Sequence, residues 1–221
     1  MVLLRGASGT MKSSLAYYIL YENALHGAPG LYVTVEQPAG NLLDHVASLG
    51  LKPTAVSEAL PVLDVSRGRE HLESSASRLA NLSEGRVDSS SVALRILKDK
   101  ITDLQRPSGF RLLVIDSWDA LGLILDFSGD RAQTFSFFDW LRDLQITSLL
   151  ISEEPAADSN LSNLDEEFLA DGIIHLRNVP ISETSFQRRI QCLKMRGVNQ
   201  NTDFRTLLFE NGRFEVARAI G

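Results

Sequence analysis

The first fifteen residues constrain the fold of this chain more than any other stretch. The apolar run Val2-Leu3-Leu4 is followed by the glycine-containing segment Gly6–Ser13, and a helical pattern of apolar residues begins directly after it. A strand, a glycine loop, a Lys-Ser pair and a helix, in this order, form the context of a phosphate-binding loop. Small residues let successive backbone N–H groups turn toward one anion, and the helix adds the positive end of its dipole.

The pattern gives the residues of this loop separate roles. We expect Lys12 to contact the β- and γ-phosphates of a nucleotide and the Ser13 hydroxyl to bind Mg²⁺. Met11 stands where the pattern G-x-x-x-x-G-K-[ST] has its last glycine. The alternative is an ordinary glycine turn that precedes a helix and leaves Lys12 in solvent. The expected nucleotide-binding residues are Gly6, Ala7, Ser8, Gly9, Thr10, Met11, Lys12, Ser13 and Ser14.

Three carboxylates follow segments that the sequence predicts to be strands. Glu36 follows residues 31–35, Asp116 ends the apolar run that starts at Leu112, and Glu153 comes soon after residues 148–151. Ligands of open α/β sheets bind beyond the carboxyl ends of the strands, where these side chains would meet the loop. We expect Asp116 to assist Mg²⁺ binding, or else to cap a helix. Glu36 is predicted to be the general base, or else a surface acid.

Lys194 and Arg196 lie two residues apart in a predicted strand, so both side chains point to one face of it. On an edge strand they would form a pair of cations, and an arginine supplied by a neighbouring subunit can stabilise charge on a transferring phosphoryl group. The alternative is a solvated strand face, where lysines discourage aggregation. Spacing alone does not decide between the two.

The order of the predicted elements indicates an α/β protein with a mostly parallel sheet. Strands alternate with helices up to about residue 176, and a hairpin around Asn211-Gly212 then indicates antiparallel strands at the carboxyl end. The serine-rich stretch 66–91 is predicted to be a polar surface excursion within a single domain of residues 1–221. Trp118, Trp140 and the cluster Phe135/Phe137/Phe138 are expected to pack in the core or at an interface.

Composition narrows the classes of function and location. The net charge of −6 disfavours a protein that mainly binds nucleic acid. The single cysteine, Cys192, is compatible with a reducing cytoplasm. The apolar start is interrupted by Arg5 and glycines, and no run approaches the ~20 apolar residues of a membrane span, so we expect neither a signal peptide nor a membrane anchor. The histidines and Cys192 show no metal-ligand spacing.

The segments already described also resemble a known family when taken together. Gly6–Ser13, Tyr32–Gln37, Ile115–Ser117, Ala170–Arg177 and Leu193–Gly197 are similar to the KaiC-like branch of the RecA-type ATPases. The resemblance implies a three-layer RecA-like P-loop NTPase fold, ATP with Mg²⁺ as cofactors, and a homo-oligomer, commonly a hexameric ring with nucleotide between subunits. It also implies that Glu36 is the catalytic glutamate, and that Lys194 and Arg196 are lent to the phosphates of the neighbouring subunit.

The sequence departs from this family at four places. Met11 replaces the last glycine of the loop, and Gln37 replaces the second of two paired glutamates. The chain is expected to begin inside the first strand, without the segment that the family places before it. Glu167-Phe168 stands where the autokinase half of KaiC has neighbouring Ser and Thr hydroxyls, so the chain resembles the ATPase half.

The sequence therefore predicts a cytoplasmic, Mg-ATP-binding, slowly hydrolysing regulatory ATPase that works with an unidentified protein partner. A non-catalytic nucleotide-binding scaffold is one alternative. A recombinase-like, DNA-dependent ATPase is another, which the acidic balance and the lack of a basic, aromatic-interleaved stretch disfavour.

Overall fold

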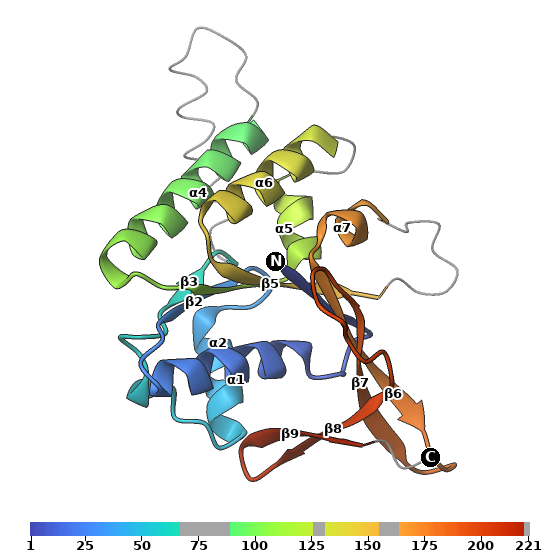
Figure 1. Cartoon of the computed structure of the whole chain (residues 1–221). Helices are drawn as coiled ribbons and strands as arrows, with labels where there is room; N and C mark the ends of the chain where they lie inside the picture. The colour runs from blue at the N-terminus through green and yellow to red at the C-terminus, as the bar shows by residue number, and fades with distance from the viewer. Residues whose placement is uncertain (67–88, 126–130, 155–163, 219–221) are drawn as a thin grey trace, which may run out of the picture.

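The computed structural model describes residues 1–66, 89–125, 131–154 and 164–218, and its strands form one nine-stranded sheet (Figure 1). Along the sheet the strand order is β3-β2-β4-β5-β1-β6-β7-β8-β9. Neighbours from β3 to β6 pair in parallel, whereas β6 to β9 pair antiparallel. The strands are β1 Val2–Gly6, β2 Gly30–Thr34, β3 Val62–Asp64, β4 Leu112–Asp116, β5 Thr147–Glu153, β6 Gly172–Pro180, β7 Phe186–Met195, β8 Arg205–Glu210 and β9 Arg213–Arg218.

Helices cover both faces of the parallel part of the sheet. Figure 1 shows α1 and α2 on one face and α4, α5 and α6 on the other, so the molecule has three layers. The helices are α1 Lys12–Leu25, α2 Ala39–Ser48, α4 Ser89–Ser108, α5 Trp118–Ile124, α6 Arg131–Asp143 and α7 Leu164–Leu169, with a short 3-10 turn at Pro53–Ala55. The predicted α/β fold with a mostly parallel sheet and antiparallel strands at the carboxyl end is confirmed.

The central strands are buried on both faces, because successive side chains of a strand point in opposite directions. Leu3 packs into the core beneath α4, α5 and α6, whereas its neighbour Leu4 packs into the core beneath α1 and α2. Leu31 and Tyr32 divide in the same way. This double burial explains why these strands have continuous apolar sequences and why parallel pairing is possible there.

The carboxyl-terminal strands curl round beside α1 (Figure 1). Asn211 and Gly212 both have positive φ angles, 51° and 75°, as the tight turn between β8 and β9 requires. Phe214 of β9 packs on Tyr18 of α1 with their ring centroids 5.3 Å apart. The predicted hairpin is therefore correct, and its inner face completes the core on this side of the sheet.

Two short helices were not predicted from the sequence. They are α5, directly after β4, and α7, which precedes β6. Residues 67–88 of the predicted polar excursion 66–91 lie outside the described residues, and residues 89–91 belong to α4. Trp118, Phe137 and Phe138 are buried as expected, but Phe135 is 46% exposed. None of the helices in the described ranges has the length and apolar character needed to cross a membrane.

Candidate active site

A cavity of about 380 Å³ lies where β1, β2, β4 and β5 end. The parallel pairing of these strands brings their carboxyl ends to one edge of the sheet, as the sequence predicted for Glu36, Asp116 and Glu153. The residues that line the cavity are Ser8, Gly9, Thr10, Met11, Lys12, Ser13, Ser14, Glu36, Gln37, His45, Asp116, Ser117, Ile151 and Glu153.

The loop between β1 and α1 depends on its glycines and on one unusual residue. A Cβ atom at Gly6 would lie 2.2 Å from the Leu176 carbonyl oxygen, so only glycine fits there. Gly9 has a φ of 79°. Met11, directly before α1, has φ 67° and ψ 31°, the left-handed conformation that favours glycine. The loop therefore takes a glycine-type conformation at Met11 although the residue is not glycine.

Lys12 is held inside the loop and is not in solvent. The residue is 7% exposed, and its Nζ donates hydrogen bonds to the carbonyl oxygens of Gly6 at 2.7 Å and Ala7 at 3.0 Å. The Glu153 carboxylate lies 3.9 Å from the same Nζ. The ammonium group thus sits at the cavity wall with carbonyl partners that an anion could replace, which excludes the solvated-lysine alternative.

Asp116 is a buried carboxylate with two hydroxyl partners. The Tyr32 hydroxyl donates to its Oδ2 at 2.5 Å, and Ser13 also hydrogen-bonds to it. Burial raises the pKa of Asp116, and the nearby charge of Glu36 raises it further, although the two hydroxyls and Lys12 oppose the shift. The helix-cap alternative for Asp116 is wrong, because the Ser117 side chain caps α5 by accepting a hydrogen bond from the Ala120 N–H.

Glu36 lies at the mouth of the cavity. Its side chain is exposed, and the Ser117 hydroxyl donates a hydrogen bond to its Oε1. The neighbouring Gln37 contributes a backbone carbonyl that accepts a hydrogen bond from Thr34 Oγ1 at 2.6 Å. Glu36 is therefore an oriented carboxylate that water can reach, as a general base must be.

Several residues around the cavity were missed from the sequence. Tyr32 and Ser117 orient Asp116 and Glu36, and the Asp119 carboxylate accepts the Glu153 N–H at 2.7 Å. His45 Nε2 lies 3.1 Å from the Ser14 hydroxyl oxygen. Tyr32 and Ser117 adjoin motif residues, which was a usable signal. His45 lies in the last turn of the amphipathic helix α2, and nothing in its local sequence distinguishes it.

The comparisons with known proteins agree with this geometry. A family model described as ATPase: KaiC matches residues 1–217. The chain belongs to the KaiC family of ATPases. It is 26% identical to the circadian clock protein KaiC2 of Synechocystis sp., covering 95% of this chain and 35% of KaiC2. It is also 26% identical to the circadian clock oscillator protein KaiC of Parathermosynechococcus lividus, covering 88% of this chain and 34% of that protein.

This KaiC-family chain thus spans about a third of the length of the curated relatives it matches. Among solved structures, it resembles the KaiC-like protein PH0186 from the hyperthermophilic archaeon Pyrococcus horikoshii OT3. The TM-score is 0.76 at 22% identity, over 97% of this chain and 88% of that one. The structural likeness confirms the RecA-like fold.

Lys194 and Arg196 of this KaiC-family chain do not line the cavity. Both contact the end of α7, where Lys194 Nζ donates to the Glu167 carbonyl at 2.7 Å and Arg196 Nη2 donates to the Phe168 carbonyl at 2.6 Å. Lys194 belongs to β7, but Arg196 follows the end of that strand, so the prediction that both lie in one strand is wrong for Arg196. β7 is not an edge strand, because β8 pairs with it at residues 189–190. The two cations lie close together, as predicted, but they do not reach the phosphate-binding loop of their own chain.

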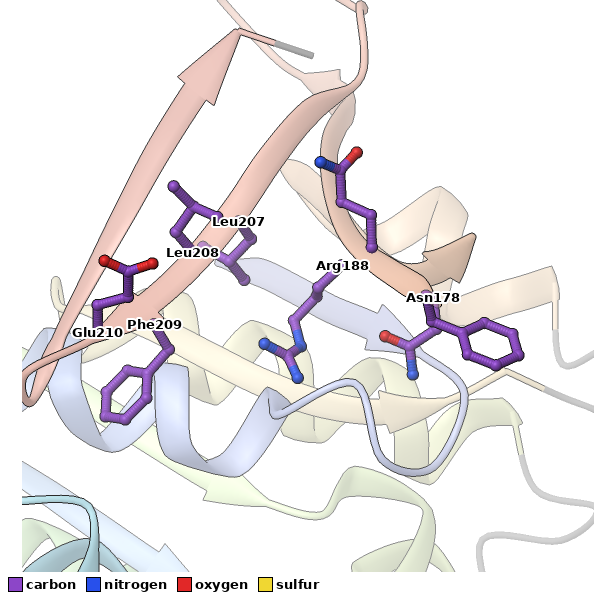
Figure 2. Close-up of a pocket in the computed structure, with 8 residues that line it drawn as sticks. Asn178, Arg188, Leu207, Leu208, Phe209 and Glu210 are labelled. Atoms are coloured by element: carbon purple, nitrogen blue, oxygen red, sulfur yellow. The ribbon is translucent and has the colours of Figure 1, made fainter. Parts of the chain in front are cut away.

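A second cavity of about 460 Å³ is lined by residues of β6, β7 and β8. Figure 2 shows the Arg188 side chain extending into it between Phe209 and Asn178. Burial lowers the pKa of Arg188, and its Nε has no hydrogen-bond partner among the described residues. This cavity shares no lining residue with the one at the loop.

The cavity at the loop fits a magnesium ion bound together with phosphates. Mg²⁺ prefers oxygen ligands and is usually held by one or two carboxylates plus substrate phosphates. Ser13 and Asp116 offer a hydroxyl and a carboxylate that already hydrogen-bond to each other. Within the described ranges, no group of three or more His, Cys, Asp or Glu side chains could hold a metal without such a ligand.

Proposed function

We propose that this chain is a single KaiC-like domain that binds Mg-ATP and hydrolyses it slowly. The observation that carries the proposal is Lys12, whose buried ammonium group is held by the carbonyls of Gly6 and Ala7 at the wall of a cavity that also contains Asp116 and Glu36. Phosphate oxygens can replace these carbonyls as acceptors, with backbone N–H groups and the start of α1 as further anion partners.

The residues of the cavity divide the chemistry of hydrolysis between them. Lys12 would bind the β- and γ-phosphates, and Ser13 and Asp116 would hold Mg²⁺, which neutralises charge that develops on the phosphoryl group. Glu36 would take a proton from the attacking water, because it is exposed and is oriented by the Ser117 hydroxyl. Gln37, next to it, cannot take a proton at its side chain, so turnover is expected to be slow.

The site is completed by a second copy of the chain. Lys194 and Arg196 lie outside the cavity of their own chain, so they would reach the phosphates of a neighbouring subunit in a hexameric ring or a related homo-oligomer. To do so they must leave the carbonyls of Glu167 and Phe168, which occupy them here. We further propose that the assembly works in the cytoplasm, where an unidentified protein partner recognises its nucleotide state.

A nucleotide-binding scaffold without turnover is a second candidate. It is favoured by Gln37 in the place of a second carboxylate and by the side chain at Met11, which adds bulk to the phosphate loop. Both candidates require ATP binding at the loop, and the rate of phosphate release separates them.

The test of the proposal is ATP binding by Lys12→Ala, measured by calorimetry with Mg²⁺. Loss of the charge that faces the phosphates should weaken binding strongly. Lys52→Ala, which changes an exposed lysine outside the cavity, is the matched control and should bind normally. Because Lys12 is buried, thermal unfolding without nucleotide must show that the variant is folded. A folded Lys12→Ala variant with unchanged ATP affinity would overturn the phosphate-loop assignment.

A further inference from the structure

One imidazole lines the cavity at the loop. His45 lies in the last turn of α2, and its Nε2 is 3.1 Å from the hydroxyl oxygen of Ser14. Ser14 belongs to the first turn of α1, directly after Ser13, and is only 3% exposed. The hydrogen bond therefore joins an exposed titratable ring on α2 to a buried hydroxyl at the phosphate end of α1.

The direction of this hydrogen bond depends on the tautomer and on the charge of the ring. We assign the proton of the neutral ring to Nδ1, so that Nε2 accepts and the Ser14 hydroxyl donates its only proton to the ring. A protonated imidazole carries N–H groups at both nitrogens, so Nε2 donates and the Ser14 oxygen accepts. The Ser14 proton is then available for another acceptor, such as a phosphate oxygen in the cavity.

We propose that His45 is a nucleotide-affinity residue, whose protonation turns the Ser14 hydroxyl toward bound phosphate and makes the chain hold ATP more tightly as the pH falls. The inference rests on the proposed function and adds a regulating group to the same site. It needs no movement of the backbone, because the proton changes only which of the two partners donates.

Most charged side chains around the cavity are acidic, so a proton on His45 changes the charge that a nucleotide meets there. Its walls carry one cationic side chain, Lys12 from the start of α1, against the carboxylates of Glu36 after β2, Asp116 at the end of β4 and Glu153 at the end of β5. On α2 itself, Asp44 precedes His45, and on β3 the Asp64 carboxylate accepts the Ala39 N–H at the opposite end of the helix. A polyanionic nucleotide entering this mostly acidic cavity gains from each added positive charge.

A purely structural role for His45 makes a different prediction. A cation in the last turn of a helix stabilises the helix through its dipole, whether or not nucleotide is present. Substitution would then change thermal unfolding of the free chain and leave the pH dependence of nucleotide affinity alone. The two roles are therefore separable by measuring binding and unfolding at the same two pH values.

The experiment is calorimetric titration of Mg-ATP at about pH 6 and about pH 8, on either side of the range in which histidine usually titrates. It uses the unchanged chain, His45→Gln and His26→Gln. His26 is the matched control, because it is an exposed histidine at the far end of α1 that hydrogen-bonds to the Glu22 carbonyl. The nucleotide's own terminal phosphate titrates in this range, so the result is the difference between variants at each pH.

We expect the unchanged chain and His26→Gln to gain about tenfold more affinity on acidification than His45→Gln, the factor that a charge-assisted hydrogen bond contributes. His45→Lys keeps a donor and a charge at both pH values, so it should bind at about pH 8 at least as tightly as the unchanged chain. Equal pH dependence in the unchanged chain and His45→Gln would overturn the inference. If instead Lys12→Ala binds ATP normally, the proposed function itself has failed.

Discussion

Met11 keeps the backbone conformation of a glycine in the loop while adding a side chain there. Its backbone has the left-handed geometry that a glycine adopts easily, with φ 67°. For a residue with a Cβ atom this conformation costs about 1–2 kcal/mol. The loop nevertheless forms, because Gly9, the Thr10 hydroxyl bond to the Ala7 carbonyl and the bonds from Lys12 hold the residues around it. The strained backbone conformation and the bulky side chain of Met11 are separate properties, and two substitutions distinguish their effects.

Met11→Gly should relieve the backbone strain, whereas Met11→Ala should remove only the long side chain. We expect Met11→Gly to exceed Met11→Ala in free energy of unfolding by about 1 kcal/mol, measured by urea titration. Because both variants remove bulk from the phosphate loop, both should bind ATP at least as tightly as the unchanged chain. A clear loss of ATP affinity in both would mean that the thioether side chain contacts the nucleotide.

Asp116, the proposed magnesium ligand, is buried at a cost in stability. Its pKa is raised by burial, so the folded chain holds this proton more tightly than the unfolded chain does. The protonated form of Asp116 contributes stability at low pH. This contribution is lost as the pH rises from the ordinary pKa of 3.8 through the raised pKa of the folded chain. At neutral pH the charged carboxylate therefore destabilises the nucleotide-free fold.

Asp116→Asn should remove this cost and keep an oxygen that can accept from Tyr32. The nucleotide-free variant should be at least as stable as the unchanged chain at about pH 7, with the difference shrinking toward about pH 4. The stabilisation that Mg-ATP adds should be lost with the carboxylate. Thermal unfolding with and without Mg-ATP measures both effects. If Mg-ATP stabilises the variant as much as the unchanged chain, Asp116 is not a magnesium ligand.

Glu36 is the residue on which turnover should depend. Positioned general bases typically contribute about 10²–10⁴-fold to a rate. Glu36→Gln keeps an oxygen for the Ser117 hydroxyl, so it should lose most phosphate release while its ATP affinity stays close to normal. Glu153→Gln is the comparison, because Glu153 lies at the same edge of the sheet and 3.9 Å from Lys12. Near-normal turnover by Glu36→Gln would move the role of base to Glu153 or Glu154.

At the scale of elements, the strands that carry the site could be predicted and the short helices could not. Buried parallel strands such as β4 have uninterrupted apolar sequences, and a carboxylate at their end is visible as the point where that run stops. The same logic placed Glu36 and Glu153 at the same edge. The glycine loop was recognisable because the residues that its backbone conformation requires lie close together in the sequence.

The elements that the sequence did not predict depend on contacts between residues that are far apart in the chain. Helix α5 has seven residues and α7 has six, too few for a clear helical period, and isolated helices of this length do not form without tertiary contacts. The partners of Lys194 and Arg196 are backbone carbonyls of α7, which no side-chain pattern reports. The bond between His45 and Ser14 joins residues that lie 31 positions apart, so only the packing of α2 on the loop reveals it.

At the scale of the whole molecule, we propose that two copies of the chain share the site. The loop, Asp116 and Glu36 line one cavity, whereas Lys194 and Arg196 lie outside it and contact α7. In this proposal, a neighbouring copy presents its phosphates to these two cations. Activity should then depend on protein concentration, since dilution separates the two halves of the site.

Complementation between two inactive variants tests this arrangement. Glu36→Gln lacks the base and Arg196→Ala lacks the guanidinium, which can bridge phosphate oxygens bidentately as lysine cannot. Each should be slow alone, because arginines supplied across an interface contribute about 10³–10⁵-fold in well-studied nucleotide hydrolases. In a mixture, some interfaces pair an intact Glu36 with an intact Arg196, so phosphate release should recover in part. Arg213→Ala, an exposed arginine of β9, is the control and should remain active alone. A mixture that stays inactive while mass spectrometry shows mixed oligomers would mean that Arg196 acts within its own chain or not at all.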